Sequence, residues 1–213
     1  MKKFNIGCGG VKPEGWINTD KSYNLFLSGF ALTSWIYKES KKSKVTYLNL
    51  NSPWGIEDNC ADVVYASHIL EHLRPESRKL FVEEVSRILK KGGVLRIVVP
   101  DLEALCRVYL DKLEKGDKDA SSYLLYWMNL HQDHLYPKNR PLYKKIYDFV
   151  QDYPKQHQIM LDRFSLEKYF SGPQWEGHEF SRYGSSSYLK DCIHEVECAS
   201  EDCPSVYFEC LKC

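Results

Sequence analysis

Phe-Asn-Ile-Gly-Cys-Gly-Gly (residues 4–10) carries a short apolar run straight into a glycine-rich turn. Glycine adopts positive φ and lets the backbone approach a ligand closely, and neighbouring amide N–H groups can hold a polar cofactor. A nicotinamide site would have glycine at position 12, where Lys12 stands. Its ribose-binding carboxylate would lie about 20 residues beyond the first glycine, whereas Asp20 follows Gly7 by only 13. The turn is compatible with a polar cofactor but disfavours a dinucleotide.

Short apolar runs recur through the first hundred residues, and each ends at a polar or glycine residue. Near-continuous runs of this kind are typical of parallel strands that are covered on both faces. An amphipathic helix lies between the last two runs, with Pro75 in its first turn and Lys90, Lys91 and Gly92 at its end. A strand, a helix and a second strand make a right-handed crossover, so the sequence predicts an α/β fold with a parallel sheet. The predicted strands are residues 4–6, 16–19, 45–48, 63–66 and 94–99.

The remainder of the chain has a weaker pattern. It predicts helices at 102–113, 123–130 and about 166–170, a loop over 172–187, and strand candidates at 193–197 and 206–211. Two segments, 21–44 and 101–187, follow strand ends, which form the ligand face of an open α/β sheet. We therefore expect a single domain over residues 1–213, in which these segments are insertions that form a cap or an acceptor region.

The composition is that of an ordinary globular chain, with 43% hydrophobic and 27% charged residues among 213. Twenty-nine basic side chains balance twenty-nine acidic ones, so no overall field favours nucleic acid. The uncharged apolar run 25–37 is shorter than the roughly 20 residues of a membrane span, and no secretory signal is visible. We expect a cytoplasmic protein without stable membrane insertion, whose eight cysteines are mostly thiols. Residues 25–37 are expected to form a core or interface helix; a lid over the acceptor pocket or a helix on a lipid surface are the alternatives.

Five ordered segments resemble the class I S-adenosylmethionine-dependent methyltransferases, especially the small bacterial and archaeal members with Ser-His-x-Leu-Glu-His after the fourth strand. The segments are residues 4–10, 15–20, 47–50, 66–73 and 89–102. The resemblance implies a Rossmann-like sheet of seven mostly parallel strands, with helices on both faces and helical insertions at the ligand face. Residues 205–209 resemble the family's last strand, which runs antiparallel.

The resemblance also implies the cofactor, S-adenosyl-L-methionine, with S-adenosyl-L-homocysteine as its product. Asp20 would take the two ribose hydroxyls. Two positions depart from the family pattern. Asn49 stands where many members have Asp, although its amide could still pair with adenine. Asn5 replaces an acidic residue before the first glycine, which is expected to weaken the hold on the cofactor's amino group. The remaining cofactor-binding residues implied in this way are Gly7, Cys8 and Gly9 around the methionine and ribose, Asn49 and Leu50 at adenine, and Ser67 at the methionine end. Asp20 and Asn49 could alternatively be simple turn residues at strand ends.

Methyl transfer from a sulfonium is a one-step displacement, so alignment of acceptor, methyl group and sulfur can supply most of the acceleration. A hydroxyl or ammonium acceptor must also lose a proton to a base. His68 and His72 titrate in the useful range and follow the fourth strand directly, so we expect them to be the catalytic residues. His157 and Asp162, in a stretch that resembles the family's segment before its last helix, are further candidates on the acceptor side.

Two metal interpretations compete with this one. His68-Ile69-Leu70-Glu71-His72 fits the inverted zinc-peptidase motif H-x-x-E-H, although Pro75 leaves little room for the helix that this motif needs. Cys198, Cys203, Cys210 and Cys213 could supply thiolates, but only the last pair has a favoured spacing. We therefore expect no metal among the functional residues.

The sequence does not specify the methyl acceptor. Because no basic groove suggests a polynucleotide, we expect a small-molecule or peptide acceptor and no nucleic acid. The sequence does not indicate an oligomeric state. A non-catalytic S-adenosylmethionine-binding protein is the alternative from another class, since it would have the same glycine turn and the same Asp20.

Overall fold

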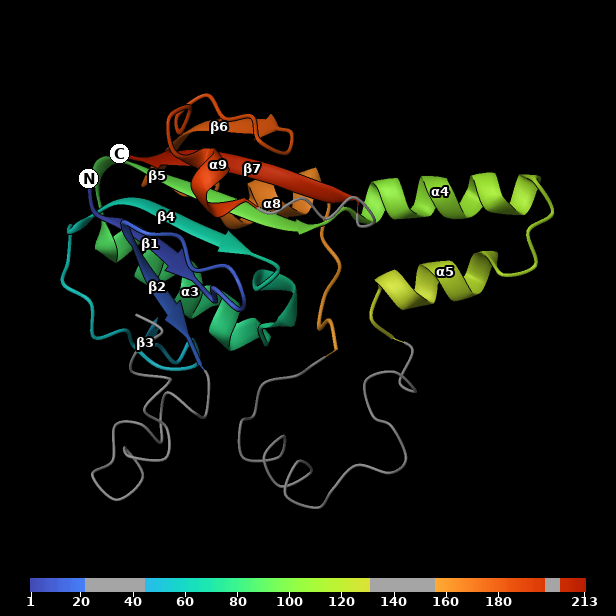
Figure 1. Cartoon of the computed structure of the whole chain (residues 1–213), viewed down its shortest axis with the longest axis horizontal. Helices are drawn as coiled ribbons and strands as arrows, with labels where there is room; N and C mark the ends of the chain where they lie inside the picture. The colour runs from blue at the N-terminus through green and yellow to red at the C-terminus, as the bar shows by residue number, and fades with distance from the viewer. Residues whose placement is uncertain (22–44, 131–155, 198–203) are drawn as a thin grey trace, which may run out of the picture.

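The computed structural model describes residues 1–21, 45–130, 156–197 and 204–213. Seven strands form one sheet in the order β3-β2-β1-β4-β5-β7-β6 (Figure 1). Strands β1 to β5 pair in parallel, while β7 runs antiparallel to both of its neighbours, β5 and β6. This confirms the predicted Rossmann-like sheet. The strands are β1 (Lys3–Ile6), β2 (Trp16–Asp20), β3 (Val45–Tyr47), β4 (Ala61–Ser67), β5 (Leu89–Pro100), β6 (Trp175–Ser181) and β7 (Ser205–Lys212).

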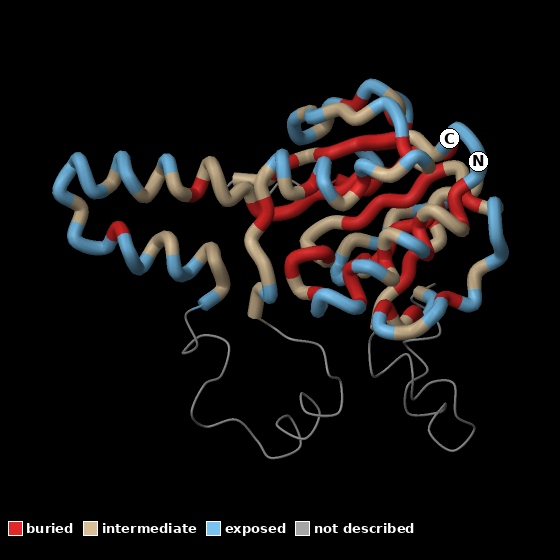
Figure 2. The backbone as a smooth tube through the Cα atoms, turned by 180° about the vertical axis from the view of Figure 1, so that it is seen from behind, coloured by how far each residue is buried: buried red, intermediate tan, exposed pale blue. Residues whose placement is uncertain are grey.

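The central strands are mostly apolar because helices cover both faces of the sheet, with Asn5 of β1 and Arg96 of β5 as buried polar exceptions. Along β4, Val64 and Ala66 pack with helix α3 (Pro75–Ile88) and helix α8 (Arg163–Tyr169), while Val63 and Tyr65 pack with the short helix α9 (Ile193–Val196). This alternation is the period of two that a strand imposes on its side chains. Figure 2 shows the buried residues concentrated along these strands.

Helix α3 ends earlier than the sequence pattern predicts. Pro75 occupies the first turn as expected, but the last helical residue is Ile88, and the segment expected to end the helix belongs instead to β5. Leu89 pairs with Ala61 of β4, and an irregularity in the ladder follows before the regular pairing resumes at Val94. Burial of Leu89 against the neighbouring strand therefore overrides the local helix-ending signal.

Two predictions near the C-terminal end are wrong. Part of the expected loop 172–187 is strand β6, and the strand candidate 193–197 is the single-turn helix α9. Strand β6 is an edge strand in which only Trp175 is buried and the other residues are intermediate or exposed, so it lacks an apolar pattern. In α9 the buried residues are Ile193 and Val196, three positions apart, which is the spacing of one helical face.

Helices α4 (Leu102–Glu114) and α5 (Ala120–Trp127) form a hairpin that extends from the sheet (Figure 1). Asp101 caps α4 through the amide of Ala104, and Asp162 caps α8 through the amide of Ser165. The segment 25–37 lies outside the described residues, as do parts of both expected insertions. Within the described part of the chain, no helix combines the length and apolarity needed to cross a bilayer.

Candidate functional site

The glycine turn after β1 is fixed by backbone and side-chain hydrogen bonds. Gly7 and Gly9 both have positive φ, at 67° and 49°. Between them, the Cys8 amide donates to the Thr19 carbonyl at 2.9 Å, which ties the turn to β2. Asn5 is buried, and its Nδ2 donates to the Val11 carbonyl at 2.9 Å and to Asn18 Oδ1 at 3.0 Å. Where the family pattern has an acid, this chain therefore uses an amide as a donor that closes the turn.

Asp20 lies against this turn from the end of the neighbouring strand. Its Oδ2 accepts a hydrogen bond from the Gly9 amide at 2.9 Å, and its carbonyl accepts one from the Leu48 amide at 3.0 Å. The residues at the end of β3 follow directly, with Leu50 buried and Asn49 half-buried. Asn49 Oδ1 accepts from the Asn51 amide at 3.2 Å, which is a turn interaction. The carboxylate of Asp20 is thus in direct contact with the glycine turn.

A cavity of about 280 Å³ opens beside the glycine turn, at the carboxyl ends of the central strands. Five of the residues predicted from the sequence line it: Gly7, Cys8, Gly9, Ser67 and His68. Asp20, Asn49, Leu50 and His72 are not among its lining residues. Eight further residues line the cavity and were not predicted as site residues: Asn5, Val11, Tyr65, Val98, Val196, Glu197, Ser205 and Tyr207. Asn5 and Val11 belong to the glycine turn, whereas Val196, Glu197, Ser205 and Tyr207 form a wall from the C-terminal part of the chain.

The cavity wall carries side chains that stay neutral near pH 7. Burial raises the pKa of the Cys8 thiol to about 11, and the negative charge of Asp20 adds to this effect. Burial is also the main reason why the pKa of Tyr65 is raised. Cys8 is therefore a thiol rather than a nucleophilic thiolate, which fits a role in lining the site.

His68 has an unusual backbone conformation for a residue with a side chain. Its φ is 53°, and its amide donates to the Val98 carbonyl of β5 at 2.9 Å. Its Nδ1 lies 3.3 Å from Oε1 of Glu71. Non-glycine residues at positive φ are uncommon and cluster at functional sites. His68 is thus held at the edge of the cavity by the end of β4.

His72 lies in a different place from His68. Its ring meets that of His157 edge to face, with centroids 4.8 Å apart. Burial lowers the pKa of His157 to about 4. Of the two predicted catalytic histidines, His68 therefore lines the cavity, whereas His72 does not line it and lies in a cluster with Glu71 and His157. Asp162, the other acceptor-side candidate, caps α8.

The local geometry does not match the zinc-peptidase interpretation of the sequence, and it tests only part of the cysteine interpretation. The peptidase motif needs two histidines on one face of a regular helix, but in H-x-x-E-H only Leu70–His72 is helical, as a single 3₁₀ turn. Cys198 and Cys203 lie outside the described residues. Cys210 is fully buried in β7, and burial raises the pKa of its thiol, as expected for a structural cysteine.

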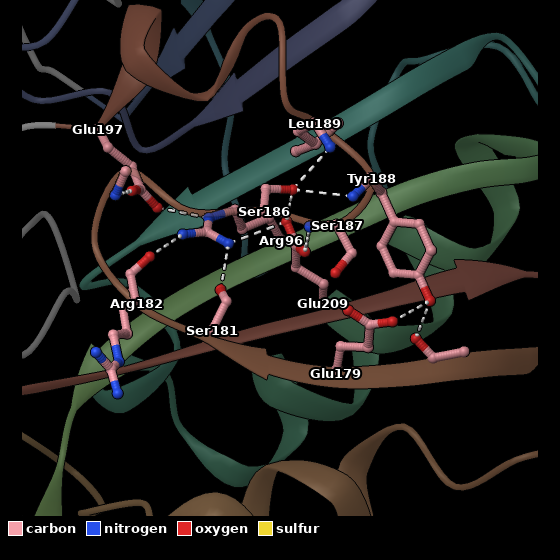
Figure 3. Close-up of polar contacts among 12 residues, drawn as sticks. Arg96, Glu179, Ser181, Arg182, Ser186, Ser187, Tyr188, Leu189, Glu197 and Glu209 are labelled. Carbon is pink, nitrogen blue, oxygen red and sulfur yellow. Dashed lines mark hydrogen bonds and ion pairs between the residues drawn. The ribbon is translucent and has the colours of Figure 1, made fainter.

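A buried ion network supports the cavity wall that sequence reasoning missed (Figure 3). Arg96 of β5 is 0% exposed and donates from Nε to Glu197 Oε1 at 2.5 Å and from Nη1 to Glu209 Oε1 at 2.9 Å. Its guanidinium also lies over the ring of Tyr207, 5.2 Å from the centroid. Since Glu197 and Tyr207 both line the cavity, Arg96 positions two groups of the wall at once. The Ser186 hydroxyl and the Gly184 amide complete the network through Glu209 and Glu197.

A second cavity, of about 310 Å³, adjoins the first. The two share Ser205 and Tyr207 as lining residues. The second is otherwise lined mainly by the start of α4 and by β6, including Arg107 and Phe180. The two cavities therefore lie next to the same two residues at the start of β7.

Replacing Gly7 with alanine is expected to destabilise the protein by about 1–2 kcal/mol, the cost of a left-handed residue that carries a Cβ. The added Cβ would also lie 2.2 Å from Cδ1 of Ile69, so that side chain must move. Urea denaturation of the two proteins measures this difference. Gly10→Ala is the matched control, because a Cβ there meets nothing within 4 Å. Equal losses in the two variants would contradict the account of the turn.

Comparisons with known proteins give one match to a family profile and several similar solved structures. Residues 4–97 match the sequence profile of a family described as "Methyltransferase domain". A search of curated protein sequences found no match. Similar solved structures are all of low sequence identity. The CMeT domain of the citrinin polyketide synthase is 13% identical with a TM-score of 0.51, over 99% of this chain and 46% of the other, so the chain spans less than half of that protein.

Two further similar structures cover more of the other chain. A possible histamine N-methyltransferase from Thermotoga maritima is 15% identical over 99% of this chain and 81% of the other, with a TM-score of 0.49. A SAM-dependent methyltransferase from Methanosarcina mazei is 12% identical over 99% and 91%, also with a TM-score of 0.49. The strand order and the glycine turn show that the chain has the Rossmann-like methyltransferase fold. Its residues 4–97 match the methyltransferase-domain family.

Proposed function

We propose that this protein is an S-adenosylmethionine-dependent methyltransferase. The observation that carries the proposal is the contact between Asp20 and the glycine turn, at 2.9 Å, beside the cavity of about 280 Å³. A carboxylate at the end of β2 is suited to accept hydrogen bonds from two ribose hydroxyls, and the positive-φ glycines leave room for a ligand close to the backbone. The profile match over residues 4–97 supports the same activity.

The residues present fit this cofactor. A Cβ on Gly9 would meet no atom within 4 Å, so the backbone there faces open space. In the proposal, Gly7, Cys8 and Gly9 hold the methionine and ribose parts, Asn49 and Leu50 hold adenine, and Ser67 lies at the methionine end. The cofactor, when bound, supplies an electrophilic methyl group. The chain's own part is to align the acceptor with it and to exclude water, which can account for about 7–11 kcal/mol of the barrier.

The acceptor side is proposed to be the wall that contains Glu197 and Tyr207. Glu197 and Tyr207 line the same cavity as the glycine turn, and Tyr207 also lines the second cavity. In the proposal, the acceptor occupies the second cavity and approaches the first beside Tyr207. The charged residues around the second cavity balance, since Arg107 and Arg163 face Asp101 and Glu103. The balance suits a small-molecule or peptide acceptor more than a polyanion.

His68 is the proposed general base, since it lines the cavity. Asparagine tolerates positive φ, so His68→Asn keeps the backbone and removes the imidazole. We expect kcat to fall by about 10²–10⁴-fold, the usual contribution of a positioned base, while the affinity for S-adenosylhomocysteine stays within a few fold. Steady-state kinetics at saturating acceptor measures the effect. An unchanged kcat would remove His68 from the chemistry.

Two measurements test the function itself. Melting temperature is followed with S-adenosylhomocysteine and, separately, with NAD; at one hundred times its dissociation constant a ligand adds about 2.7 kcal/mol of stability. Stabilisation by the nucleoside alone supports the proposed cofactor, and no stabilisation overturns it. Incubation with methyl-labelled S-adenosylmethionine and a cell extract then separates an enzyme from a non-catalytic binding protein, because only the enzyme transfers the label.

A further inference from the structure

The single turn Leu70–His72, next to the cavity, contains a buried carboxylate in an unusual setting. The side chain of Glu71 is 1% exposed. Among the described residues, neither of its carboxylate oxygens accepts a hydrogen bond. Its ion-pair contact is Nδ1 of His68, 3.3 Å from Oε1. Because an ionised carboxylate without donors is costly to bury, this arrangement calls for a compensating positive charge.

Backbone hydrogen bonds hold the segment that contains His157 against the turn that contains Glu71 and His72. The carbonyl of Glu71 accepts hydrogen bonds from the amides of Gln158 at 2.7 Å and Ile159 at 3.3 Å. These contacts place His157 beside His72, with ring centroids 4.8 Å apart. The site is therefore organised by main-chain contacts between residues 71 and 158–159, which do not depend on what the side chains bind.

We propose that Glu71, His72 and His157 form a binding site for a divalent transition-metal ion of the zinc type. One potential ligand atom from each of the three side chains lies within 4.8 Å of the others. Zinc–nitrogen and zinc–oxygen bonds are about 2.0–2.2 Å, so ligand atoms in a tetrahedral site lie roughly 3.4 Å apart. Side-chain rotations that shorten the longest distance between two ligand atoms by at most about 1.4 Å would bring all three to the spacing of a tetrahedral site.

The donor set selects the class of ion. Two imidazole nitrogens and one carboxylate oxygen suit zinc and its neighbours among the divalent transition metals, whereas magnesium and calcium prefer oxygen ligands. Nδ1 of His157 lies 3.3 Å from Sδ of Met160, which assigns Nε2 as its metal ligand. The site differs from the peptidase motif, because Glu71 is a ligand rather than a base and His157 replaces His68.

Three protein ligands leave one position of a tetrahedral ion open to water or to an oxygen of the acceptor. Glu71 contacts His68, which lines the cavity, so the ion would lie close to the proposed acceptor side. A role in holding the acceptor rests on the proposed methyl transfer. Metal binding itself does not, and its test is independent of activity.

The experiment uses the full chain, stripped with a chelator and titrated calorimetrically with zinc chloride alone. One equivalent of zinc is expected to bind. Cobalt(II) is then substituted, because its absorption spectrum distinguishes imidazole and carboxylate ligands from the thiolates that eight cysteines could supply. Absence of binding, or a cobalt spectrum with thiolate charge-transfer bands, would overturn the proposal.

Two variants locate the site. Loss of a group that only supports a metal ligand typically weakens metal binding 10–100-fold, so His157→Gln and Glu71→Gln are each expected to weaken zinc binding about a hundredfold or more. His194→Gln is the matched control, an exposed histidine on α9, and is expected to bind zinc normally. The far-UV circular dichroism spectrum and the melting temperature of each stripped variant, compared with those of the stripped unaltered protein, show that the fold is intact whether or not the protein binds S-adenosylhomocysteine. Normal zinc binding by His157→Gln would also overturn the proposal.

Discussion

Replacing Asp20 with asparagine is expected to weaken the binding of S-adenosylhomocysteine about a hundredfold. The carboxylate is the proposed acceptor for two ribose hydroxyls, and hydrogen bonds to a charged group contribute about 1.5–3 kcal/mol each. Asparagine keeps the size of the side chain, but its amide offers one accepting oxygen in place of two. Because one carboxylate oxygen already accepts from the Gly9 amide, the variant cannot satisfy both the turn and the ligand. Isothermal calorimetry measures the loss.

The control for this prediction is Asp111→Asn on α4. Asp111 is an exposed carboxylate that pairs with Lys115, four residues later on the same helix. Its replacement is expected to leave the affinity unchanged. If Asp20→Asn bound S-adenosylhomocysteine as tightly as the unaltered protein, Asp20 would be a turn residue and the proposed ribose site would be wrong.

The second large effect is expected at Arg96. Arg96→Met leaves Glu197 and Glu209 buried without their cation, and breaking a buried ion pair in this way costs about 3–5 kcal/mol. Since small domains are stable by about 5–15 kcal/mol, this is a large share of the total. The free energy of unfolding, from urea denaturation, measures the change. We also expect weaker binding in the cavity, because Glu197 and Tyr207 both depend on Arg96 for their positions.

Two further variants test whether the loss of stability in Arg96→Met comes from uncompensated charge. Arg107→Met removes an exposed arginine that pairs with Glu103 at 2.7 Å on α4, and exposed pairs of this kind contribute about 0–1 kcal/mol. Adding Glu197→Gln and Glu209→Gln to Arg96→Met removes the uncompensated charges, so part of the lost stability should return. A triple variant no more stable than Arg96→Met would show that the loss is one of packing rather than of charge.

The first half of the fold was predictable because its signals are local. Apolar strands that end in polar residues, and one amphipathic helix, define β1 to β5 and α3 without knowledge of their neighbours. Strand β6 was not predictable in this way, since only one of its residues is buried and the segment becomes a strand by pairing with the edge of β7. Helix α9 was missed because a four-residue segment is too short for a period of two to be distinguished from one of 3.6.

The candidate site also contains a part that local sequence signals predict and a part that they do not. The glycine turn, Asp20 and Ser67 follow their strands directly in sequence, so their meeting could be predicted from parallel pairing alone. The wall from the C-terminal part of the chain contains Glu197 and Tyr207, whose approach depends on the pairing of β7 with β5 and on the buried Arg96. The sequence shows that Arg96 is a charged residue inside an apolar run, but its partners, Glu197 and Glu209, are more than a hundred residues away in sequence and no local pattern indicates them.

The position of β7 between β5 and β6 has a consequence for synthesis on the ribosome. β6 is made before β7, yet among the strands that the structure describes β7 is its only neighbour in the sheet. When residues 175–181 emerge, they have none of these strands to pair with until residues 205–212 follow them. The nascent chain therefore exposes unpaired strand edges on β5 and on β6 while the intervening segment is translated. Slow codons in that interval would prolong the exposure and favour pairing between neighbouring chains.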